Sequence, residues 1–173
     1  MIKSGGFFFY KGMRCIIGAV ISFKGLPYIV TASHIFGREG ERVTVDGREF
    51  AVKIIFKDFD LALIELPSDC AFEITEFGSA AVLENASLVN DAHAIACRVI
   101  NAGTSLLYLS FPSFDMPQPG DSGSPIQQTG KVIGLLSSFT LNNCTGTAIS
   151  SNILRSLGDN ENKSRLKKHS FFK

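Results

Sequence analysis

The sequence predicts an all-β fold of short antiparallel strands with one helix near its C-terminus, and two observations support this prediction. Short apolar runs rich in β-branched residues recur along the chain, and Gly, Asp or Pro residues separate them. Hydrophobic residues make up 45% of the sequence, which is enough to build a substantial core. Chains of this kind commonly close their sheets into barrels, because closure removes exposed strand edges.

Each half of the sequence contains four runs that are predicted as strands. They are RCIIGAVIS (14–22), LPYIVT (26–31), EFAVKIIF (49–56), LALIEL (61–66), HAIACRVI (93–100), TSLLYLSF (104–111), KVIGLLSSF (131–139) and GTAIS (146–150). Between residues 67 and 90 this pattern weakens around Pro67, Gly78 and Asn85. We therefore expect a connection between two smaller barrels there.

One segment has the features of a helix. The stretch SSNILRSLG (150–158) offers Ser150 or Ser151 as the N-cap and Gly158 as the stop signal. The charged segment 158–173 that follows is expected to be a solvated tail, with a basic partner-binding tail as the alternative.

Composition excludes several classes of protein. The net charge is only +1 and no basic stripe with interleaved aromatic residues occurs, so we expect no nucleic-acid binding by the core domain. No apolar run is long enough to span a bilayer, and the N-terminus lacks the pattern of a secretion signal. These features predict a soluble, cytoplasmic protein without a membrane segment.

The four cysteines are expected to be free thiols. Cys15, Cys70, Cys97 and Cys144 lie far apart and form no C-x-x-C pair. No Cys/His cluster has the spacing of a zinc site, so no metal ion is expected.

The stretch QPGDSGSPI (118–126) places Ser122 between two glycines. Glycine allows a sharp turn and a close approach of another backbone, which suits a serine that must be reached from outside. The alternative is an ordinary surface loop rich in Gly, Asp, Ser and Pro. A serine hydroxyl is a poor nucleophile at neutral pH, so a catalytic Ser122 needs an imidazole base and a carboxylate that orients this base.

Three histidines are candidates for the base. His34 follows YIVTAS (28–33), so it lies where a predicted strand ends in a small-residue turn, a common position for catalytic groups. His93 opens a predicted strand and is expected to be structural. His169 lies in the charged tail.

Two aspartates are candidates for the carboxylate. Asp58 and Asp60 precede the apolar strand 61–66, and a period of two would place both on one face. Geometry alone does not separate them, but Asp60 adjoins the buried run and is the better shielded of the two.

Three segments together resemble the chymotrypsin-like serine proteases of the trypsin superfamily, or PA clan. They are TASH (31–34), DLALI (60–64) and GDSGSP (120–125), in this order, and the resemblance covers roughly residues 14 to 155. It implies two six-stranded antiparallel β-barrels packed face to face within one protease domain. The first barrel, residues 1–75, would carry the histidine and aspartate, and the second, residues 76–157, the serine and the substrate pocket.

The resemblance also implies roles for individual residues, and it implies no cofactor. Ser122 would attack the scissile carbonyl, His34 would transfer the proton and Asp60 would orient His34. The backbone amides of Gly120 and Ser122 would form the oxyanion hole. Ser137, in GLLSSF, matches the family's serine that hydrogen-bonds the catalytic aspartate.

By the same resemblance, the residue before the scissile bond, P1, enters a pocket with Met116 at its base. Its walls are Pro117, Gln118, Pro119, Ser137, Ser138 and Phe139, with Gly146 opposite. No aspartate lies at the base, which disfavours Lys or Arg at P1. Relatives that prefer Glu or Gln have a histidine where this chain has Leu136. The pocket is therefore expected to accept a medium-sized or aromatic apolar side chain.

The compact, disulfide-free character of the chain resembles the polyprotein-processing proteases of RNA viruses. We therefore expect a peptide or protein substrate, such as its own polyprotein, and a location in the host cytoplasm. A bacterial intracellular trypsin-like protease is the alternative. A catalytically silent binding module with the same fold, or a β-barrel interaction protein such as a capsid with coincidental motifs, remain further alternatives. The sequence leaves the oligomeric state open.

Overall fold

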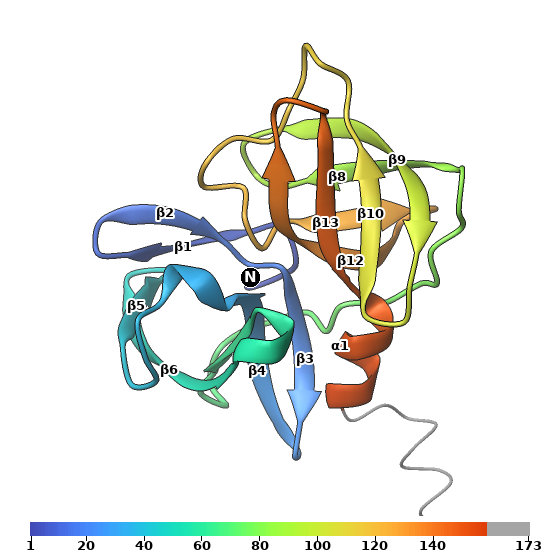
Figure 1. The fold of residues 1–173 in the computed structure, drawn as a ribbon. Coiled ribbons are helices and arrows are strands. Elements are labelled where there is room, and N and C mark those ends of the chain that lie inside the picture. Colours follow the sequence, from blue (N-terminus) through green and yellow to red (C-terminus); the bar gives the residue numbers. More distant parts are fainter. Residues whose placement is uncertain (159–173) are drawn as a thin grey trace, which may run out of the picture.

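The computed structural model describes residues 1–158, which form two all-β halves that lie side by side (Figure 1). The strands of the N-terminal half are β1 (Phe7–Tyr10), β2 (Met13–Ile16), β3 (Ala19–Phe23), β4 (Leu26–Ala32), β5 (Arg42–Val45), β6 (Arg48–Phe56) and β7 (Leu61–Glu65). Two short 3-10 helices, η1 (Ser33–Ile35) and η2 (Lys57–Phe59), follow β4 and β6. The C-terminal half holds β8 (Asn85–Val89), β9 (Ala94–Ala102), β10 (Leu106–Ser110), β11 (Pro125–Gln128), β12 (Lys131–Thr140), β13 (Thr145–Ser150) and α1 (Ser151–Leu157).

The two halves close to different extents. The C-terminal half is a closed barrel in the order β10-β13-β12-β11-β8-β9, whereas the N-terminal half is a curled seven-stranded sheet in the order β2-β1-β5-β6-β7-β4-β3. The predicted all-β fold of two packed antiparallel units with a short C-terminal helix is confirmed. The first unit differs in detail from the expected six-stranded barrel, because it has seven strands and two free edges.

The N-terminal half has more strands than predicted partly because one predicted run forms two strands. The predicted strand 14–22 is divided into β2 and β3, because the backbone changes its hydrogen-bond partner between Ile17 and Gly18. The amide of Ile17 bonds to the Gly6 carbonyl, whereas that of Gly18 bonds to the Val30 carbonyl. The interruption places Gly18 against the loop that contains Ser122.

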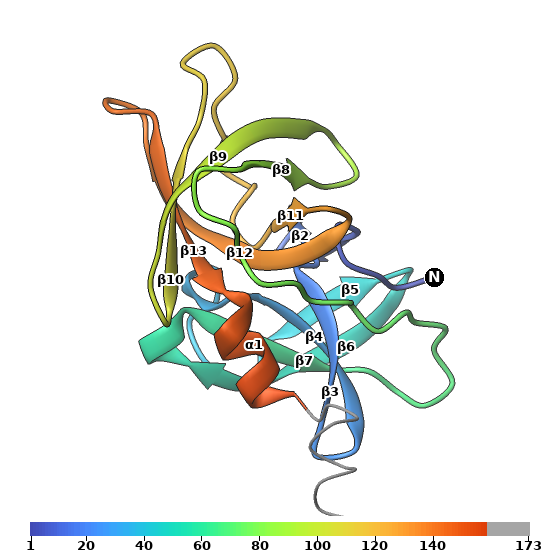
Figure 2. The same cartoon turned by 90° about the vertical axis from the view of Figure 1, so that its right-hand side faces the viewer.

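The C-terminal helix begins and ends as the sequence predicts. Ser150 has extended backbone angles, and its side chain accepts a hydrogen bond from the Asn152 amide at 3.2 Å. The Gly158 amide bonds to the Leu154 carbonyl at 3.0 Å, and Leu154 is fully buried. Of the two candidate N-cap residues, Ser150 is therefore the one that caps the helix. The helix packs against β12 and β13 (Figure 2).

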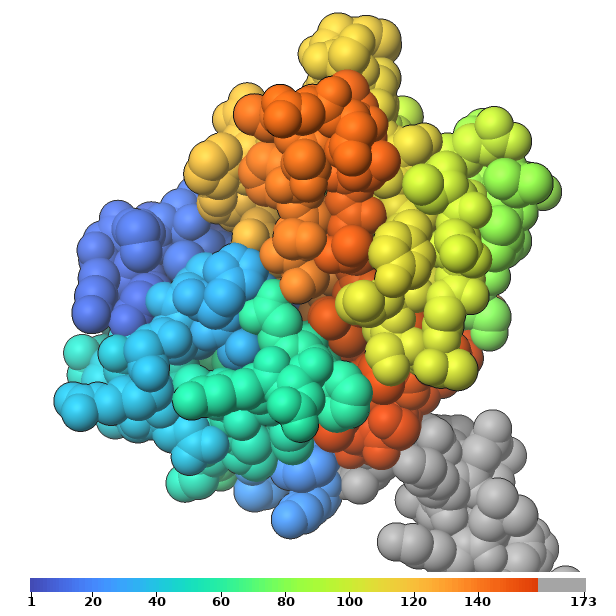
Figure 3. Space-filling view, viewed as in Figure 1, coloured from blue at the N-terminus to red at the C-terminus, as the bar shows by residue number. Residues whose placement is uncertain are grey.

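A hydrophobic cluster joins the two halves. From the N-terminal half it contains Ala19, Ile21, Tyr28, Val30, Leu61 and Leu63, and from the C-terminal half Val132, Leu135, Ile149 and Leu154. Each half also has an apolar core of its own. The surfaces of the two halves meet across the face seen in Figure 3. Burial of the shared cluster fixes how the two halves sit relative to one another.

The segment between the halves contacts both of them. It runs from the end of β7 at Glu65 to the start of β8 at Asn85, which includes the predicted boundary between residues 75 and 76. Phe72 forms a bridge with Ile2, and Phe77 forms one with Val132. The predicted charged tail, including His169, lies outside the described residues apart from Gly158.

All four cysteines are free thiols, and Cys15 and Cys97 are buried. Burial raises the pKa of the Cys97 thiol to about 12, and it also raises the pKa of Cys15. Within residues 1–158, no helix is long and apolar enough to cross a membrane.

We predict that Gly18→Ala lowers the free energy of unfolding by about 1–3 kcal/mol, because overpacking displaces fixed neighbours. A Cβ atom at this position would lie 2.5 Å from the Gly123 carbonyl oxygen and 2.6 Å from Leu135 Cδ1. Urea denaturation measures the effect. Gly103→Ala is the matched control, because its Cβ would meet nothing closer than 3.5 Å. Equal stability of the two variants would contradict this interpretation of the packing.

Candidate active site

Three side chains from separate segments meet where the two halves join. His34 lies in η1 directly after β4, Asp60 lies between η2 and β7, and Ser122 lies in the loop between β10 and β11. His34 Nδ1 is 2.8 Å from Asp60 Oδ2, and His34 Nε2 is 3.1 Å from Ser122 Oγ. With Nδ1 donating to the carboxylate, the lone pair of Nε2 faces the Ser122 hydroxyl.

The local backbone holds His34 against Asp60. The Ser33 amide donates to the Asp60 carbonyl at 3.1 Å, and the His34 amide donates to Asp60 Oδ1 at 2.8 Å. The Ser33 hydroxyl donates to the same carboxylate oxygen at 3.1 Å. The end of β4 is thus fastened to the start of β7, with which it pairs.

Asp60 adopts a backbone conformation that is uncommon for a residue with a side chain. Its φ and ψ of 52° and 44° lie in the left-handed region, which Asp tolerates better than most residues. Burial raises the pKa of its carboxyl group, but hydrogen bonds from Ser137 at 2.6 Å and from His34 outweigh this effect, so that the pKa is lowered overall. Asp60 is therefore ionised at neutral pH.

Asp58 does not take part in this arrangement. It lies in η2 and is exposed, whereas Asp60 follows η2 and contacts the imidazole. The expectation that a period of two places both carboxylates on one face is wrong, because neither residue belongs to a strand.

The loop around Ser122 depends on glycine. Gly120 and Gly123 have φ values of +101° and +87°, which glycine adopts without strain. A Cβ at Gly123 would lie 2.5 Å from Thr31 Oγ1. Among residues 1–158, the amides of Gly120 and Ser122 donate to no other protein group, in contrast to the Asp121, Gly123 and Ser124 amides. Two backbone donors beside the Ser122 hydroxyl are thus available to a ligand.

The residues predicted for the substrate pocket differ in their exposure. Met116 and Phe139 are half-buried and pack against the core of the C-terminal barrel, while Pro117 and Gly146 are buried. The others are more open: Gln118, Pro119 and Ser138 are exposed, and Ser137 is half-buried. The Ser138 hydroxyl lies 2.7 Å from Thr147 Oγ1.

Two contacts of the site were not predicted from the sequence. The ring of Phe111 lies so close to Gly146 that a Cβ there would be 2.9 Å from Phe111 Cε2. His93, which was expected to be structural, contacts the serine loop through Asp121, with 2.9 Å between Nε2 and Oδ1. Neither residue has a sequence signal for these contacts, because each contact joins elements that are distant in the chain.

In the described part of the chain, no group of three or more His, Cys, Asp or Glu side chains is arranged to hold a metal ion.

Comparison with solved structures identifies the fold. The chain superposes on Thermobifida fusca protease A with a TM-score of 0.72 and 18% identity, covering 90% of this chain and 94% of that one. For Cellulomonas bogoriensis chymotrypsin the TM-score is 0.66 with 19% identity, over 90% and 94% of the two chains. For a human astrovirus serine protease it is 0.58 with 19% identity, over 87% and 91%.

The chain therefore has the chymotrypsin-like fold. Its predicted resemblance to chymotrypsin-like serine proteases is confirmed for the fold. No protein-family model matches the chain, and no curated protein matches its sequence.

We predict that Ser137→Ala lowers the free energy of unfolding at pH 7 by about 1.5–3 kcal/mol, because Asp60 loses a donor to its charged form. The lowered pKa of folded Asp60 stabilises the protein above the unfolded value of about 3.9, and this contribution is lost as the pH falls through the folded value. The difference between variant and wild type should therefore shrink below about pH 3.9.

Urea denaturation between pH 7 and pH 3 measures this dependence. Ser138→Ala is the control, because the Ser138 hydroxyl contacts Thr147 and the site contains no hydrogen bond from it to Asp60. A Ser137→Ala effect that does not change with pH would show that this hydroxyl does not act through the charge of Asp60.

Proposed function

We propose that this protein is a serine endopeptidase that uses His34, Asp60 and Ser122 as its catalytic triad. The observation that carries the proposal is the continuous chain of contacts from Asp60 through His34 to Ser122, at 2.8 and 3.1 Å. Such an arrangement activates a hydroxyl that would otherwise be a poor nucleophile.

In this mechanism, Ser122 Oγ adds to the carbonyl carbon of the scissile bond while its proton passes to His34 Nε2. His34 then gives this proton to the leaving amine as the C–N bond breaks, which leaves an acyl ester on Ser122. Water next loses a proton to His34 and adds to the ester. Ser122 regains a proton from His34 as the carboxylic acid product leaves.

The remaining residues of the site stabilise charge during these steps. The negative charge on the tetrahedral oxygen would be held by the free amides of Gly120 and Ser122. The Asp60 carboxylate would stabilise the imidazolium form of His34. Ser137 would keep Asp60 ionised, because its hydroxyl donates to the same oxygen that faces His34.

The P1 residue of the substrate is proposed to be apolar and medium-sized or aromatic. Met116 and Phe139 are half-buried hydrophobic residues that pack against the core of the C-terminal barrel, and the buried Phe111 ring lies beside Gly146. A buried Leu136 stands where a histidine would favour acidic or amide side chains. Apolar surface of this kind would gain from burying an uncharged side chain.

Two biological settings fit this activity. The first is the processing of an RNA-virus polyprotein, which the compact chain with four free cysteines supports, and an astrovirus protease shares the fold. The higher TM-score of the Thermobifida fusca enzyme, 0.72 against 0.58, favours a bacterial protease instead. The first setting predicts a natural reading frame that continues past both ends of the chain. It also predicts that the long product of this frame persists only with Ser122→Ala.

We predict that Ser122→Ala, His34→Ala and Asp60→Ala each lower kcat/KM by several orders of magnitude, without additivity, because the three groups act as a unit. A fluorophosphonate probe should label the wild type, since Ser122 Oγ bonds to phosphorus and displaces fluoride, and Ser122→Ala should abolish the labelling. Asp58→Ala is the matched control and should have a mild effect.

A folded wild type that neither labels nor cleaves peptides would favour a catalytically silent binding module. A crippling effect of Asp58→Ala beside a tolerated Asp60→Ala would contradict the assignment of the carboxylate.

We predict that the wild type cleaves a peptide library mainly after medium-sized or aromatic apolar residues, with Ser122→Ala as the blank. Mass spectrometry of the products identifies the P1 residue. Dominant cleavage after Glu or Gln would contradict the apolar pocket. Cleavage after Lys or Arg would contradict it too and would point to the exposed Asp115, next to Met116, as the partner of the cation.

A further inference from the structure

Asp121, between Gly120 and Ser122, is the one charged residue that is buried within residues 1–158, with 5% of its surface exposed. A buried carboxylate is costly unless hydrogen bonds or charges compensate it. Its side chain makes none of the contacts in the His34–Asp60–Ser122 group and bonds to His93 instead. What holds Asp121 therefore also holds the backbone on both sides of it.

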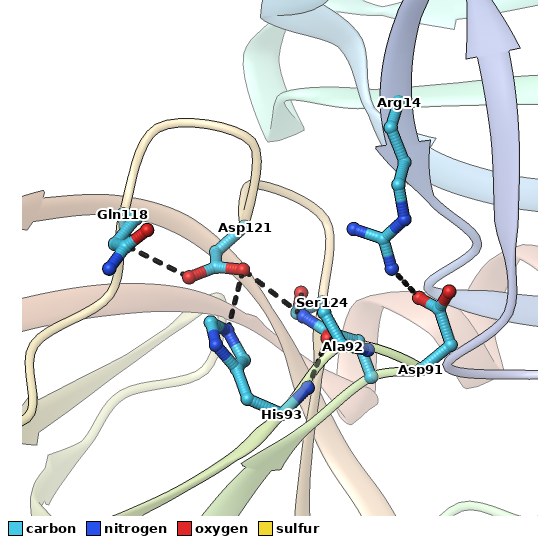
Figure 4. Close-up of polar contacts among 8 residues, drawn as sticks. Arg14, Asp91, Ala92, His93, Gln118, Asp121 and Ser124 are labelled. Carbon is cyan, nitrogen blue, oxygen red and sulfur yellow. Dashed lines mark hydrogen bonds and ion pairs between the residues drawn. The ribbon is translucent and has the colours of Figure 1, made fainter.

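Three donors hold the Asp121 carboxylate (Figure 4). His93 Nε2 lies 2.9 Å and Asn90 Nδ2 lies 3.1 Å from Oδ1, and the Gln118 amide donates to Oδ2 at 2.8 Å. Gln118 belongs to the serine loop itself, whereas Asn90 and His93 belong to the turn between β8 and β9. The turn thus supplies both side-chain donors.

The turn is itself fixed in place. The Asn90 side-chain oxygen accepts hydrogen bonds from the amides of Ala92 at 2.9 Å and His93 at 3.1 Å, which orients the start of β9. Asn90 Nδ2 also donates to Ser124 Oγ at 3.0 Å. The His93 imidazole therefore reaches Asp121 from a rigid support.

The N-terminal half braces this turn from the outside. The Asp91 amide donates to the Gly5 carbonyl at 2.9 Å, and the Arg14 guanidinium pairs with the Asp91 carboxylate. In Figure 4, Arg14 extends from its strand toward Asp91, on the side of the turn away from Gln118.

The position of the Asp121 carboxylate determines where the two free amides lie. The Asp121 amide donates to the Gln118 carbonyl at 2.9 Å, and the Asp121 carbonyl accepts from the Ser124 amide at 3.0 Å. A movement of Asp121 toward solvent would rotate the peptide units on either side of it. The unit that follows Asp121 carries the Ser122 amide. The Gly120 amide lies in the Pro119–Gly120 unit, which the two hydrogen bonds between Gln118 and Asp121 enclose.

We infer that His93 is a positioning residue for hydrolysis, which acts through Asp121 to hold the Gly120 and Ser122 amides where the tetrahedral oxygen forms. This inference rests on the proposed function. Without the His93 donor, the buried Asp121 carboxylate retains only Asn90 and the Gln118 amide, and the loop can relax toward water. The substrate side chain would still bind, but its tetrahedral intermediate would be stabilised less.

The test compares His93→Ala with His93→Gln, which keeps a side-chain N–H donor. The His93 side chain is 33% exposed, so truncation leaves no closed cavity. We expect His93→Ala to lower kcat by about tenfold to a hundredfold, with KM within about twofold, because loss of a complete oxyanion donor costs about 10²–10³ in kcat. We expect His93→Gln to recover part of this loss.

A second measurement reports on the amides directly. A peptide aldehyde adds to Ser122 and places an oxyanion between the two amides, whereas the cleaved product peptide does not. His93→Ala should weaken binding of the aldehyde by a factor similar to the loss in kcat and leave binding of the product peptide unchanged. Lys53→Gln is the control for loss of an ion-pairing side chain away from the serine loop, because Lys53 pairs with Glu65 on the sheet of the other half.

The outcomes separate this inference from the proposed function. Absence of labelling and turnover in the folded wild type would refute the proposed function and, with it, this inference. An active wild type with equal kcat and equal aldehyde binding in His93→Ala would refute the positioning role alone. A purely structural role of His93 predicts a lower melting temperature and equal losses of kcat in His93→Ala and His93→Gln. That result would also refute the positioning role. If His93→Ala does not fold, His93→Leu fills the same space without a donor and replaces it in the comparison.

Discussion

The packing between the two halves is the constraint on which the rest of the site depends. His34 and Asp60 come from the N-terminal sheet and Ser122 comes from the C-terminal barrel, so the 3.1 Å contact between His34 and Ser122 exists only while the halves keep their placement. The shared apolar cluster supplies this placement, and Gly18 allows the serine loop to approach the N-terminal sheet closely. Close-packed interiors resist small shifts, which keeps the distance short.

Local rules of backbone structure are broken where the side chains must meet. Asp60 takes a left-handed conformation, and its carboxylate accepts hydrogen bonds from Ser33, from the His34 amide, from the His34 ring and from Ser137. The strain of an uncommon conformation persists only when the surroundings hold it, and these four donors do so. The same donors orient the imidazole and keep the carboxyl group ionised.

Features encoded in nearby residues could be predicted from the sequence, whereas contacts between distant elements could not. The apolar β-branched runs predicted most of the longer strands, and Ser150 and Gly158 predicted both ends of α1. The short strands β1, β5, β8 and β11 were not predicted, because four or five residues give little periodicity and their pairing depends on neighbouring strands. The candidate residues at 34, 60 and 122 lie in short motifs. The Phe111–Gly146 and His93–Asp121 contacts have no such motif, because tertiary packing creates them.

Two histidine–aspartate pairs contact the serine loop, and they differ in which imidazole nitrogen faces the carboxylate. His34 faces Asp60 through Nδ1, so that its Nε2 reaches Ser122, whereas His93 uses Nε2 for Asp121. The Asp60 side chain is 21% exposed and that of Asp121 only 6%. The more exposed pair, His34–Asp60, can exchange protons with a substrate, while the buried carboxylate of Asp121 is suited to holding a backbone in place. The N-terminal half thus reaches the loop by two routes, directly through His34 and indirectly through Arg14, Asp91 and the turn that carries His93.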